Sequence, residues 1–148
     1  MKNKIVFIVN PISGKGKGRE VEQMIRHFFK NKPFQIDTYF ANYPAHAIEL
    51  TKQLLTEKPD MIVACGGDGT INEVAQSMLN QSIPLGIIPI GSGNGLSSNL
   101  NIPKNITLAL EGLIMNQPKM IDVGQINDRF FFSNTGFGID AQVIHRYT

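Results

Sequence analysis

The chain has 148 residues, of which 42% are hydrophobic and 18% are charged, and its formal net charge at pH 7 is +2. This size allows a hydrophobic core without disulfides, and the single cysteine, Cys65, fits a reducing compartment. The weak charge argues against a nucleic-acid-binding surface. The N-terminus lacks the apolar core of a signal peptide, and no apolar run approaches the roughly 18 residues of a transmembrane helix. We expect a soluble cytoplasmic protein, with any membrane contact peripheral and at the inner face.

Strands and helices are predicted to alternate along most of the chain. Four segments are typical of buried strands: residues 4–10, 34–40, 60–65 and 85–90. Apolar residues at the three- and four-residue spacing of one helix face occupy the segments between and after them: residues 21–29, 47–54, 71–79 and 106–114. The alternation predicts a Rossmann-like α/β fold, in which a mostly parallel sheet carries helices on both faces.

The pattern changes after Pro118. Residues 120–126 and 130–134 are predicted to form two strands around Asn127 and Asp128, and residues 136–144 also have β character. We therefore predict an α/β domain over residues 1–118 and the first strands of a second, β-rich domain over residues 119–148.

Three glycine-rich loops follow predicted strands. They are Asn10-Pro11-Ile12-Ser13-Gly14-Lys15-Gly16-Lys17-Gly18, Gly66-Gly67-Asp68-Gly69-Thr70 and Gly91-Ser92-Gly93-Asn94-Gly95. Ligands of open α/β sheets bind beyond the carboxyl ends of the strands, and glycine lets an anion approach the backbone amides. One such loop would indicate only a tight turn, but three at one edge predict a phosphate-binding site.

Two common phosphate motifs are excluded. Neither Lys15 nor Lys17 is followed by the Ser or Thr of a Walker A loop. The dinucleotide motif Gly-x-Gly-x-x-Gly fails in the first loop, where Arg19 holds the last position, and in the second, where Asn72 does. The loops therefore indicate neither a P-loop NTPase nor a standard Rossmann dehydrogenase.

Asp68 is the only carboxylate inside these loops. Beside phosphates, a carboxylate holds Mg²⁺, directly or through water, or orients the attacking hydroxyl. The alternative is an aspartate that only satisfies turn amides. Asp68 is therefore the candidate catalytic residue and the candidate metal ligand.

Thr70 and Glu73 allow two interpretations. Thr70-Ile71-Asn72-Glu73 matches a capping box, in which the threonine caps the helix and the glutamate reaches back to it. Glu73 also falls in the first helical turn beside the second loop, where it could face the site. Both roles remain open from the sequence.

The basic residues of the first loop are candidates for neutralising phosphate charge. Lys15 is the preferred candidate because of its place in the loop, whereas Arg19 is interpreted as a solvated surface charge. His46 is interpreted as a helix-start or core residue.

The ordered set of loops resembles the catalytic domain of the diacylglycerol kinase family, which includes bacterial lipid kinases and the sphingosine and ceramide kinases. The motifs are Asn10-Pro11-x-Ser13-Gly14, Gly66-Gly67-Asp68-Gly69-Thr70 and Gly91-Ser92-Gly93-Asn94. Weaker similarities extend the match over essentially the whole chain: Ala45-His46-Ala47, Ile121-Asp122-Val123-Gly124, Phe132-Ser133-Asn134 and Gly136-Phe137-Gly138-Ile139-Asp140-Ala141.

The resemblance implies an α/β nucleotide domain followed by a β-sandwich domain, with ATP and a lipid meeting in the cleft. It implies Mg²⁺ with the nucleotide, Asp68 nearest the chemistry, and Asp122 near the cleft as a second candidate catalytic residue. The residues it implies for nucleotide binding are Asn10, Pro11, Ser13, Gly14, Lys15, Gly66, Gly67, Asp68, Gly69, Thr70, Asn72, Glu73, Ser92, Gly93 and Asn94.

The chain departs from the family pattern at two points. Ala41 replaces a nucleotide-contacting threonine of many members, and members continue well beyond residue 148. We therefore expect the chain to bind nucleotide but to transfer phosphate poorly. We also expect the incomplete β unit to expose Phe130–Phe132 and Phe137 and to favour homo-oligomers. An NAD kinase-like enzyme and a non-catalytic nucleotide-binding module are the alternative functions.

Overall fold

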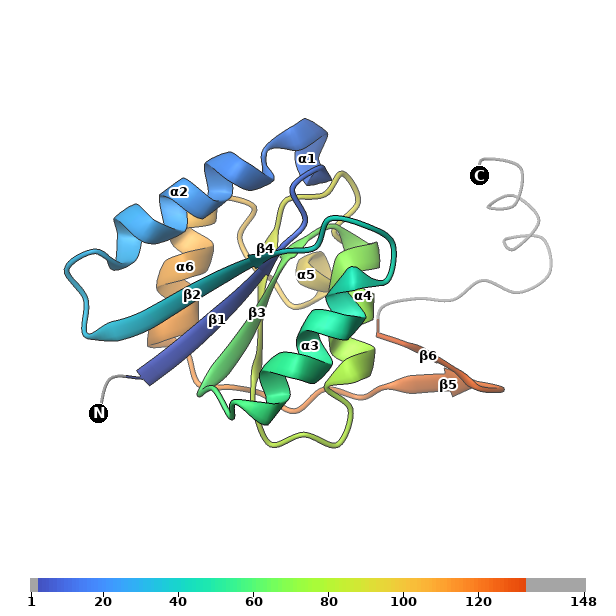
Figure 1. Cartoon of the computed structure of the whole chain (residues 1–148). Helices are drawn as coiled ribbons and strands as arrows, with labels where there is room; N and C mark the ends of the chain where they lie inside the picture. The colour runs from blue at the N-terminus through green and yellow to red at the C-terminus, as the bar shows by residue number, and fades with distance from the viewer. Residues whose placement is uncertain (1–2, 133–148) are drawn as a thin grey trace.

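The computed structural model of the chain describes residues 3–132. Its centre is a four-stranded parallel sheet with the strand order β2-β1-β3-β4 (Figure 1). The strands are β1 (Asn3–Val9), β2 (Phe34–Phe40), β3 (Met61–Gly66) and β4 (Leu85–Pro89). Each of the four strands predicted for residues 1–118 is present, with boundaries that differ by at most one residue.

Helices cover both faces of this sheet, as predicted (Figure 1). On one face lie α2 (Gly18–Phe29) and α6 (Ile106–Met115), and on the other lie α3 (His46–Thr56) and α4 (Asp68–Ser77). Along β1, Ile5, Phe7 and Val9 face the α2 and α6 side, whereas Val6 and Ile8 face the α3 and α4 side. A strand buried on both faces needs apolar residues at every position, which explains its continuous apolar run.

Two short elements lie in the loops. The helical turn α1 (Ser13–Gly16) follows β1, and α5 (Gly95–Asn99) follows β4. Gly14 and Lys15 have φ angles of 61° and 62°, so α1 is not a regular right-handed helix. The turn α1 lies within the first glycine-rich loop, and α5 begins at Gly95, the last residue of the third.

A separate two-stranded antiparallel sheet follows the α/β body, formed by β5 (Gly124–Ile126) and β6 (Arg129–Phe131). Its turn contains Asn127, at a φ of 53°, which suits a two-residue hairpin. The strand predicted over residues 120–126 was too long, because residues 120–123 have no regular structure. The segment 136–144 lies outside the described residues, and the boundary between the two predicted domains stays a prediction.

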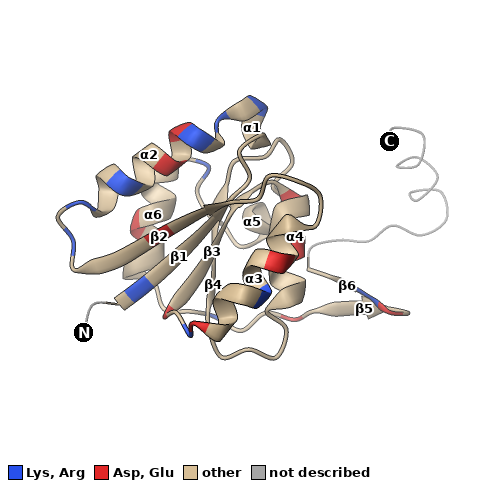
Figure 2. Ribbon diagram, viewed as in Figure 1, with Lys and Arg blue, Asp and Glu red and all other residues tan. Residues whose placement is uncertain are grey.

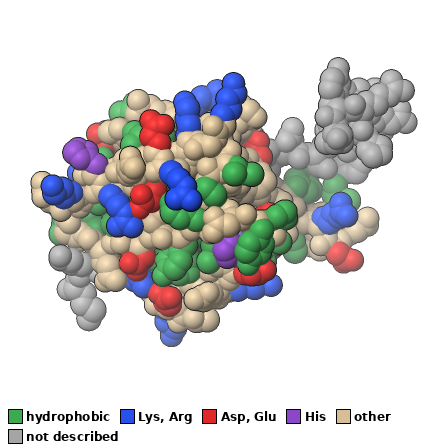
Figure 3. Space-filling model, turned by 45° about the horizontal axis from the view of Figure 1, so that its top comes forward, with side chains coloured by type: hydrophobic (Ala, Val, Ile, Leu, Met, Phe, Trp, Pro, Cys, Tyr) green, Lys and Arg blue, Asp and Glu red, His purple; other side chains and the backbone are tan. Residues whose placement is uncertain are grey.

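Charged side chains lie mainly on the helices and connections, and the strands are largely free of them (Figure 2). Figure 3 shows basic side chains among hydrophobic ones on the face turned forward, with the hairpin projecting beside the body. Within residues 3–132, no helix has the length and apolar character needed to cross a lipid bilayer.

Candidate functional site at the carboxyl edge of the sheet

The three glycine-rich loops leave the sheet at one edge. In the pairing of β1 with β3, Val9 lies opposite Cys65, and in the pairing of β3 with β4, Gly66 lies opposite Pro89. Strands that end level with one another send their loops into the same region. The sequence prediction that the loops meet is therefore confirmed.

Asn10 joins the first loop to the second. Its side-chain amide donates a hydrogen bond to the Thr70 hydroxyl, with Nδ2 and Oγ1 3.0 Å apart. Its Oδ1 accepts a bond from the backbone N–H of Ile12, at 3.1 Å. Because both polar atoms of Asn10 are used in this way, its side chain fixes the geometry of the loops.

Close backbone contacts join the third loop to the other two. A β-carbon on Gly91 would collide with Cα of Gly67, and one on Gly14 would collide with the carbonyl oxygen of Ile90. Glycine is required at Gly14 for a second reason, because its φ is 61°. The close packing of the three loops is possible only because glycine has no side chain at these positions.

Asn94 organises the third loop from within. It is 4% exposed and has a φ of 55°, in the left-handed region that asparagine tolerates. Its Oδ1 accepts from the Gly91 N–H at 3.0 Å, and its Nδ2 donates to the Gly91 carbonyl at 2.6 Å. Its amide thus closes the loop, while Ser92 and Gly93 are exposed at the tip.

The capping-box interpretation of the second loop is wrong. Helix α4 begins at Asp68, after an extended Gly67 with φ −88° and ψ −171°, and no side chain caps it. Thr70 therefore lies inside the helix, buried, where its hydroxyl accepts from Asn10. Glu73 reaches the β2–α3 connection, where Oε1 accepts from the Ala45 N–H at 3.4 Å.

Asp68 is exposed at the first position of α4. A β-carbon on Gly93 would lie 2.9 Å from its Oδ2, so the carboxylate lies against the third loop. Among the described residues, Asp68 is in no salt bridge. The same helix start presents free backbone N–H groups and a partial positive charge, which favour anions.

Metal binding at this edge would rest on Asp68. Within residues 3–132, no group of three or more histidine, cysteine, aspartate or glutamate side chains could hold a metal ion. Mg²⁺ typically takes one or two carboxylates and completes its shell with phosphate oxygens and water. A single carboxylate therefore suits Mg²⁺ that arrives with a nucleotide.

Helix α4 separates two hollows. The loop hollow, of about 210 Å³, is lined by Asn10, Pro11, Ile12, Ala41, Asn42, Tyr43, Pro44, Ala47, Thr70 and Glu73. The hairpin hollow, of about 350 Å³, is lined by Asp68, Gly69, Ile71, Asn72, Leu96 and Phe130–Phe132. The period of the helix sends Thr70 and Glu73 to one side and Asp68 and Asn72 to the other.

The sequence of the chain matches those of known proteins. The family model described as diacylglycerol kinase catalytic domain matches residues 4–126. The chain belongs to this family. A diacylglycerol kinase of Bacillus subtilis is 31% identical over 135 residues, which cover 89% of the chain and 45% of the relative. Sphingosine kinase 1 of Arabidopsis thaliana is 29% identical over 136 residues, which cover 84% of the chain and 28% of the relative.

Solved structures show the same fold. A crystal structure of a diacylglycerol kinase from Bacillus anthracis matches with a TM-score of 0.73 at 27% identity, covering 87% of the chain and 48% of that protein. The chain thus spans about half the length or less of the relatives it matches. The match confirms the predicted family and the α/β fold.

Within this diacylglycerol kinase-type domain, the predicted site residues fall into different places. Pro11, Thr70 and Glu73 line the loop hollow, whereas Asn72 lines the hairpin hollow. Lys15 is exposed in the first loop. Their roles in binding stay predictions.

Asp122, the second predicted catalytic residue, is exposed before β5. It does not line either hollow. Its predicted place near the cleft stays a prediction.

Arg19, interpreted as a solvated charge, is exposed but also lies over the Phe40 ring, 5.4 Å from its centroid.

Sequence reasoning missed two groups of lining residues. Tyr43 and its neighbours follow the carboxyl end of β2, so the edge rule that identified the glycine loops could have found them too. Leu96 and the hairpin phenylalanines carried no comparable signal.

The expected exposure of Phe130–Phe132 is wrong, because all three are half-buried and Phe132 packs against the core. Phe137 lies outside the described residues.

Two groups near this edge have altered acidity. The Tyr43 hydroxyl donates to Glu49 Oε2 at 2.8 Å, and this bond raises the pKa of Tyr43. Complete burial raises the pKa of the Cys65 thiol well above its ordinary value. Cys65 is therefore an inert core residue of β3, and the site uses no thiol chemistry from it.

Proposed function

We propose that this chain is the nucleotide-binding part of an ATP-dependent lipid kinase, which transfers the γ-phosphate of ATP to a lipid hydroxyl. The observation that carries the proposal is the convergence of three loops at Asp68, with a hollow on either side of α4. Membership of the diacylglycerol kinase family supports the reaction class. The names of the relatives support a lipid acceptor of the diacylglycerol or sphingoid type.

The nucleotide binds on the loop side in this proposal. Its phosphates lie against the backbone amides of the glycine loops and the start of α4, where the helix dipole favours negative charge. The binding set remains the one predicted: Asn10, Pro11, Ser13, Gly14, Lys15, Gly66–Thr70, Asn72, Glu73 and Ser92–Asn94. Of these, Asn10 and Asn94 act chiefly by holding the loops, since their amides already bond within the protein.

The acceptor approaches from the hairpin side. Phe130–Phe132 and Leu96 give this hollow an apolar wall, and Asp68 and Asn72 give it polar groups. An apolar wall suits the hydrocarbon part of a lipid, and polar groups suit its headgroup hydroxyl. Asn72 is therefore proposed to contact the acceptor as well as the nucleotide edge.

Asp68 is proposed to stand at the reaction centre. The acceptor oxygen attacks the γ-phosphorus, the bond to the β–γ bridging oxygen breaks, ADP leaves, and the hydroxyl proton is released to water. Asp68 either orients that hydroxyl or holds the Mg²⁺ that enters with ATP, and Mg²⁺ neutralises charge on the phosphates. Both roles require the exposed carboxylate against the third loop that the structure shows.

The test is transfer of radiolabel from γ-labelled ATP by the protein in its full natural length. The acceptor panel contains diacylglycerol, a sphingoid base, ceramide and a polyprenol, with NAD as the competing acceptor. We expect label in one lipid and none in NADP. Labelled NADP alone would replace the proposal with an NAD kinase, and ATP binding without any transfer would replace it with a nucleotide-binding module.

The 148 residues alone are expected to bind ATP and to transfer little or no phosphate, because the relatives are about twice as long or longer. Efficient lipid phosphorylation by this chain would contradict that expectation. Peripheral membrane contact and homo-oligomers stay predictions, to be checked by vesicle sedimentation and light scattering.

A further inference from the structure

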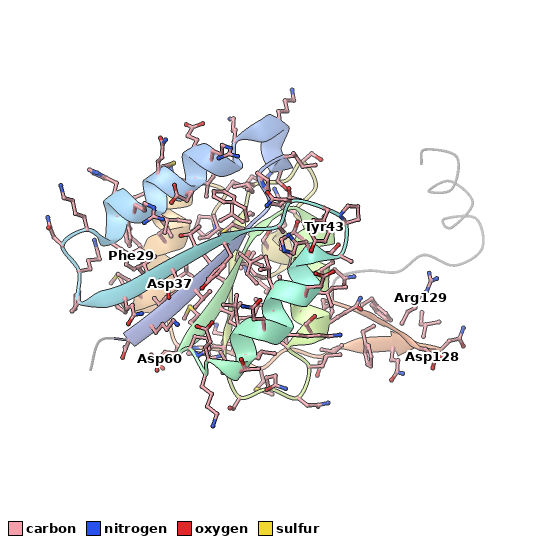
Figure 4. All side chains as sticks on the ribbon, viewed as in Figure 1. Phe29, Asp37, Tyr43, Asp60, Asp128 and Arg129 are labelled. Atoms are coloured by element: carbon pink, nitrogen blue, oxygen red, sulfur yellow. The ribbon has the colours of Figure 1, made fainter. Side chains whose placement is uncertain are left out.

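One wall of the loop hollow is the connection between β2 and α3, residues 41–45. Ala41, Asn42, Tyr43 and Pro44 all line the hollow. The segment has no regular secondary structure, and Figure 4 shows Tyr43 on it, at the carboxyl end of the sheet. A wall built from irregular backbone needs side chains to hold its shape.

His46, the first residue of α3, provides two such contacts. Its ring stacks on the Tyr43 ring, with centroids 4.0 Å apart and an interplanar angle of 6°. Its Nδ1 accepts a hydrogen bond from the backbone N–H of Asn42 at 3.1 Å. The imidazole therefore contacts the wall at two points, through its face and through its edge.

Two further hydrogen bonds hold the same wall in place. The Tyr43 hydroxyl donates to Glu49 Oε2 at 2.8 Å, and the Ala45 N–H donates to Glu73 Oε1 at 3.4 Å. Ala45 has a φ of 65°, in the left-handed region that a β-carbon disfavours. A non-glycine residue persists there only when its surroundings determine the conformation.

The wall of the hollow is open to solvent and therefore accessible to a ligand. Tyr43 remains 51% exposed and Ile12, on the opposite loop, is 79% exposed. Both line the loop hollow. Packing His46 against Tyr43 does not bury the tyrosine, so the contact orders an aromatic ring that stays accessible from the loop hollow.

We infer that His46 is a positioning residue for the nucleotide: by stacking on Tyr43 and accepting from Asn42, it sets the wall of the loop hollow and thereby the affinity for ATP. The inference rests on the proposed function, because it assumes that the nucleotide occupies this hollow. His46 itself need not touch the nucleotide. Its effect is expected in nucleotide binding and not in the chemical step.

The experiment compares substitutions that separate the two contacts, in the full-length protein. His46→Phe keeps a flat ring against Tyr43 but removes the acceptor, and His46→Asn keeps an acceptor near the Nδ1 position but removes the ring. His46→Ala removes both. We expect the KM for ATP to rise about 3- to 10-fold in each single-contact variant and further in His46→Ala, with kcat and the acceptor KM within about twofold.

Controls distinguish this effect from general destabilisation. Lys52→Ala, on the exposed side of α3, is expected to keep both KM values. Tyr43→Phe keeps the stack and removes only the hydroxyl bond to Glu49, and it is expected to shift the ATP KM less than His46→Ala does. Melting temperatures of all variants identify any that fail to fold, and calorimetric ATP binding by Tyr43→Phe and His46→Asn then supplies the comparison.

The outcomes are separable. An unchanged ATP KM in folded His46→Phe and His46→Ala would overturn the inference, as would a fall in kcat with the ATP KM unchanged. Absence of ATP binding by the wild-type protein would instead contradict the proposed function. A raised ATP KM in His46→Ala, partly restored in His46→Asn, is the result the structure predicts.

Discussion

The two ends of the central sheet differ in how they use charge. At the amino end, the Lys4 ammonium lies 2.6 Å from Glu57 and 3.3 Å from Asp37, and the Lys4 N–H donates to Asp60 Oδ2 at 2.7 Å. At the carboxyl end, Asp68 is exposed and, among the described residues, has no salt-bridge partner. Paired surface charges stabilise a fold modestly. A carboxylate without a salt-bridge partner, beside glycine loops, is instead available to interact with a ligand.

The carboxylates of this domain differ in their surroundings, and that difference separates a structural role from a ligand-binding one. Asp37 lies in the middle of β2, Asp60 directly before β3, and Asp68 two residues after the end of β3. In Figure 4, Asp37 and Asp60 lie away from the end of the sheet that carries Tyr43. Only Asp68 begins a helix at the edge where three loops meet. The predictions that follow test this contrast.

The largest effect is expected from Asp68→Asn. Loss of the carboxylate should lower the rate of phosphate transfer by about two to four orders of magnitude while ATP binding is retained. Asp60→Asn is the matched control at the opposite end, where an amide oxygen still accepts from Lys4, and it should leave turnover unchanged. Equal losses in the two variants, measured with a lipid substrate at saturating ATP, would remove the distinction between the ends.

A smaller effect is expected from Gly91→Ala. The added methyl group collides with Cα of Gly67, so the second and third loops must separate. Overpacking of this kind costs about 1–3 kcal/mol, and we expect a lower melting temperature together with about tenfold weaker ATP binding.

Gly69→Ala is the matched control for this loop contact, since its β-carbon would meet no atom within 4 Å. Its melting temperature should equal or exceed that of the wild type, because alanine favours the helix. If Gly91→Ala melts and binds ATP as the wild type does, the loops are not held together by this contact.

The smallest effect is expected at the amino end, from Lys4→Met. The hydrogen bond to Glu57 raises the pKa of Lys4 above its ordinary value of 10.5. The contribution of the pair to stability is therefore complete at neutral pH and is lost as the pH rises through the raised pKa. An exposed pair is screened, so the melting temperature should fall slightly in low salt and not in about 1 M salt. Any change in ATP affinity would contradict the structural role assigned to this end.

Much of the fold could be predicted from local pattern. Strands buried on both faces must be apolar throughout, so β1, β3 and β4 appeared as continuous runs with nearly correct ends. The meeting of the glycine loops followed from parallel topology alone. Ligand-binding edges of such sheets are therefore predictable before any side-chain geometry is known.

The details of the site depended on tertiary contacts that local pattern does not encode. The capping box at Thr70 failed because α4 already begins at Asp68, and the Thr70 hydroxyl instead accepts from Asn10, sixty residues earlier in the chain. The helix starts at Asp68, three residues before the predicted first residue, Ile71, and this start adds Asp68 and Thr70 to the residues that α4 directs toward the two hollows. Burial of Phe132 required its contact with the core, which its sequence neighbours do not indicate.

The most direct test is to determine which residues contact ATP. Amide chemical shifts of the ¹⁵N-labelled protein, followed during titration with MgATP, report binding residue by residue. We predict that the largest changes fall in residues 10–18, 66–70 and 91–95 and in the wall at residues 41–45, with none around Lys4, Asp37 and Asp60. Saturable binding whose shift changes lie away from the carboxyl edge, or the absence of any change at millimolar MgATP, would contradict it.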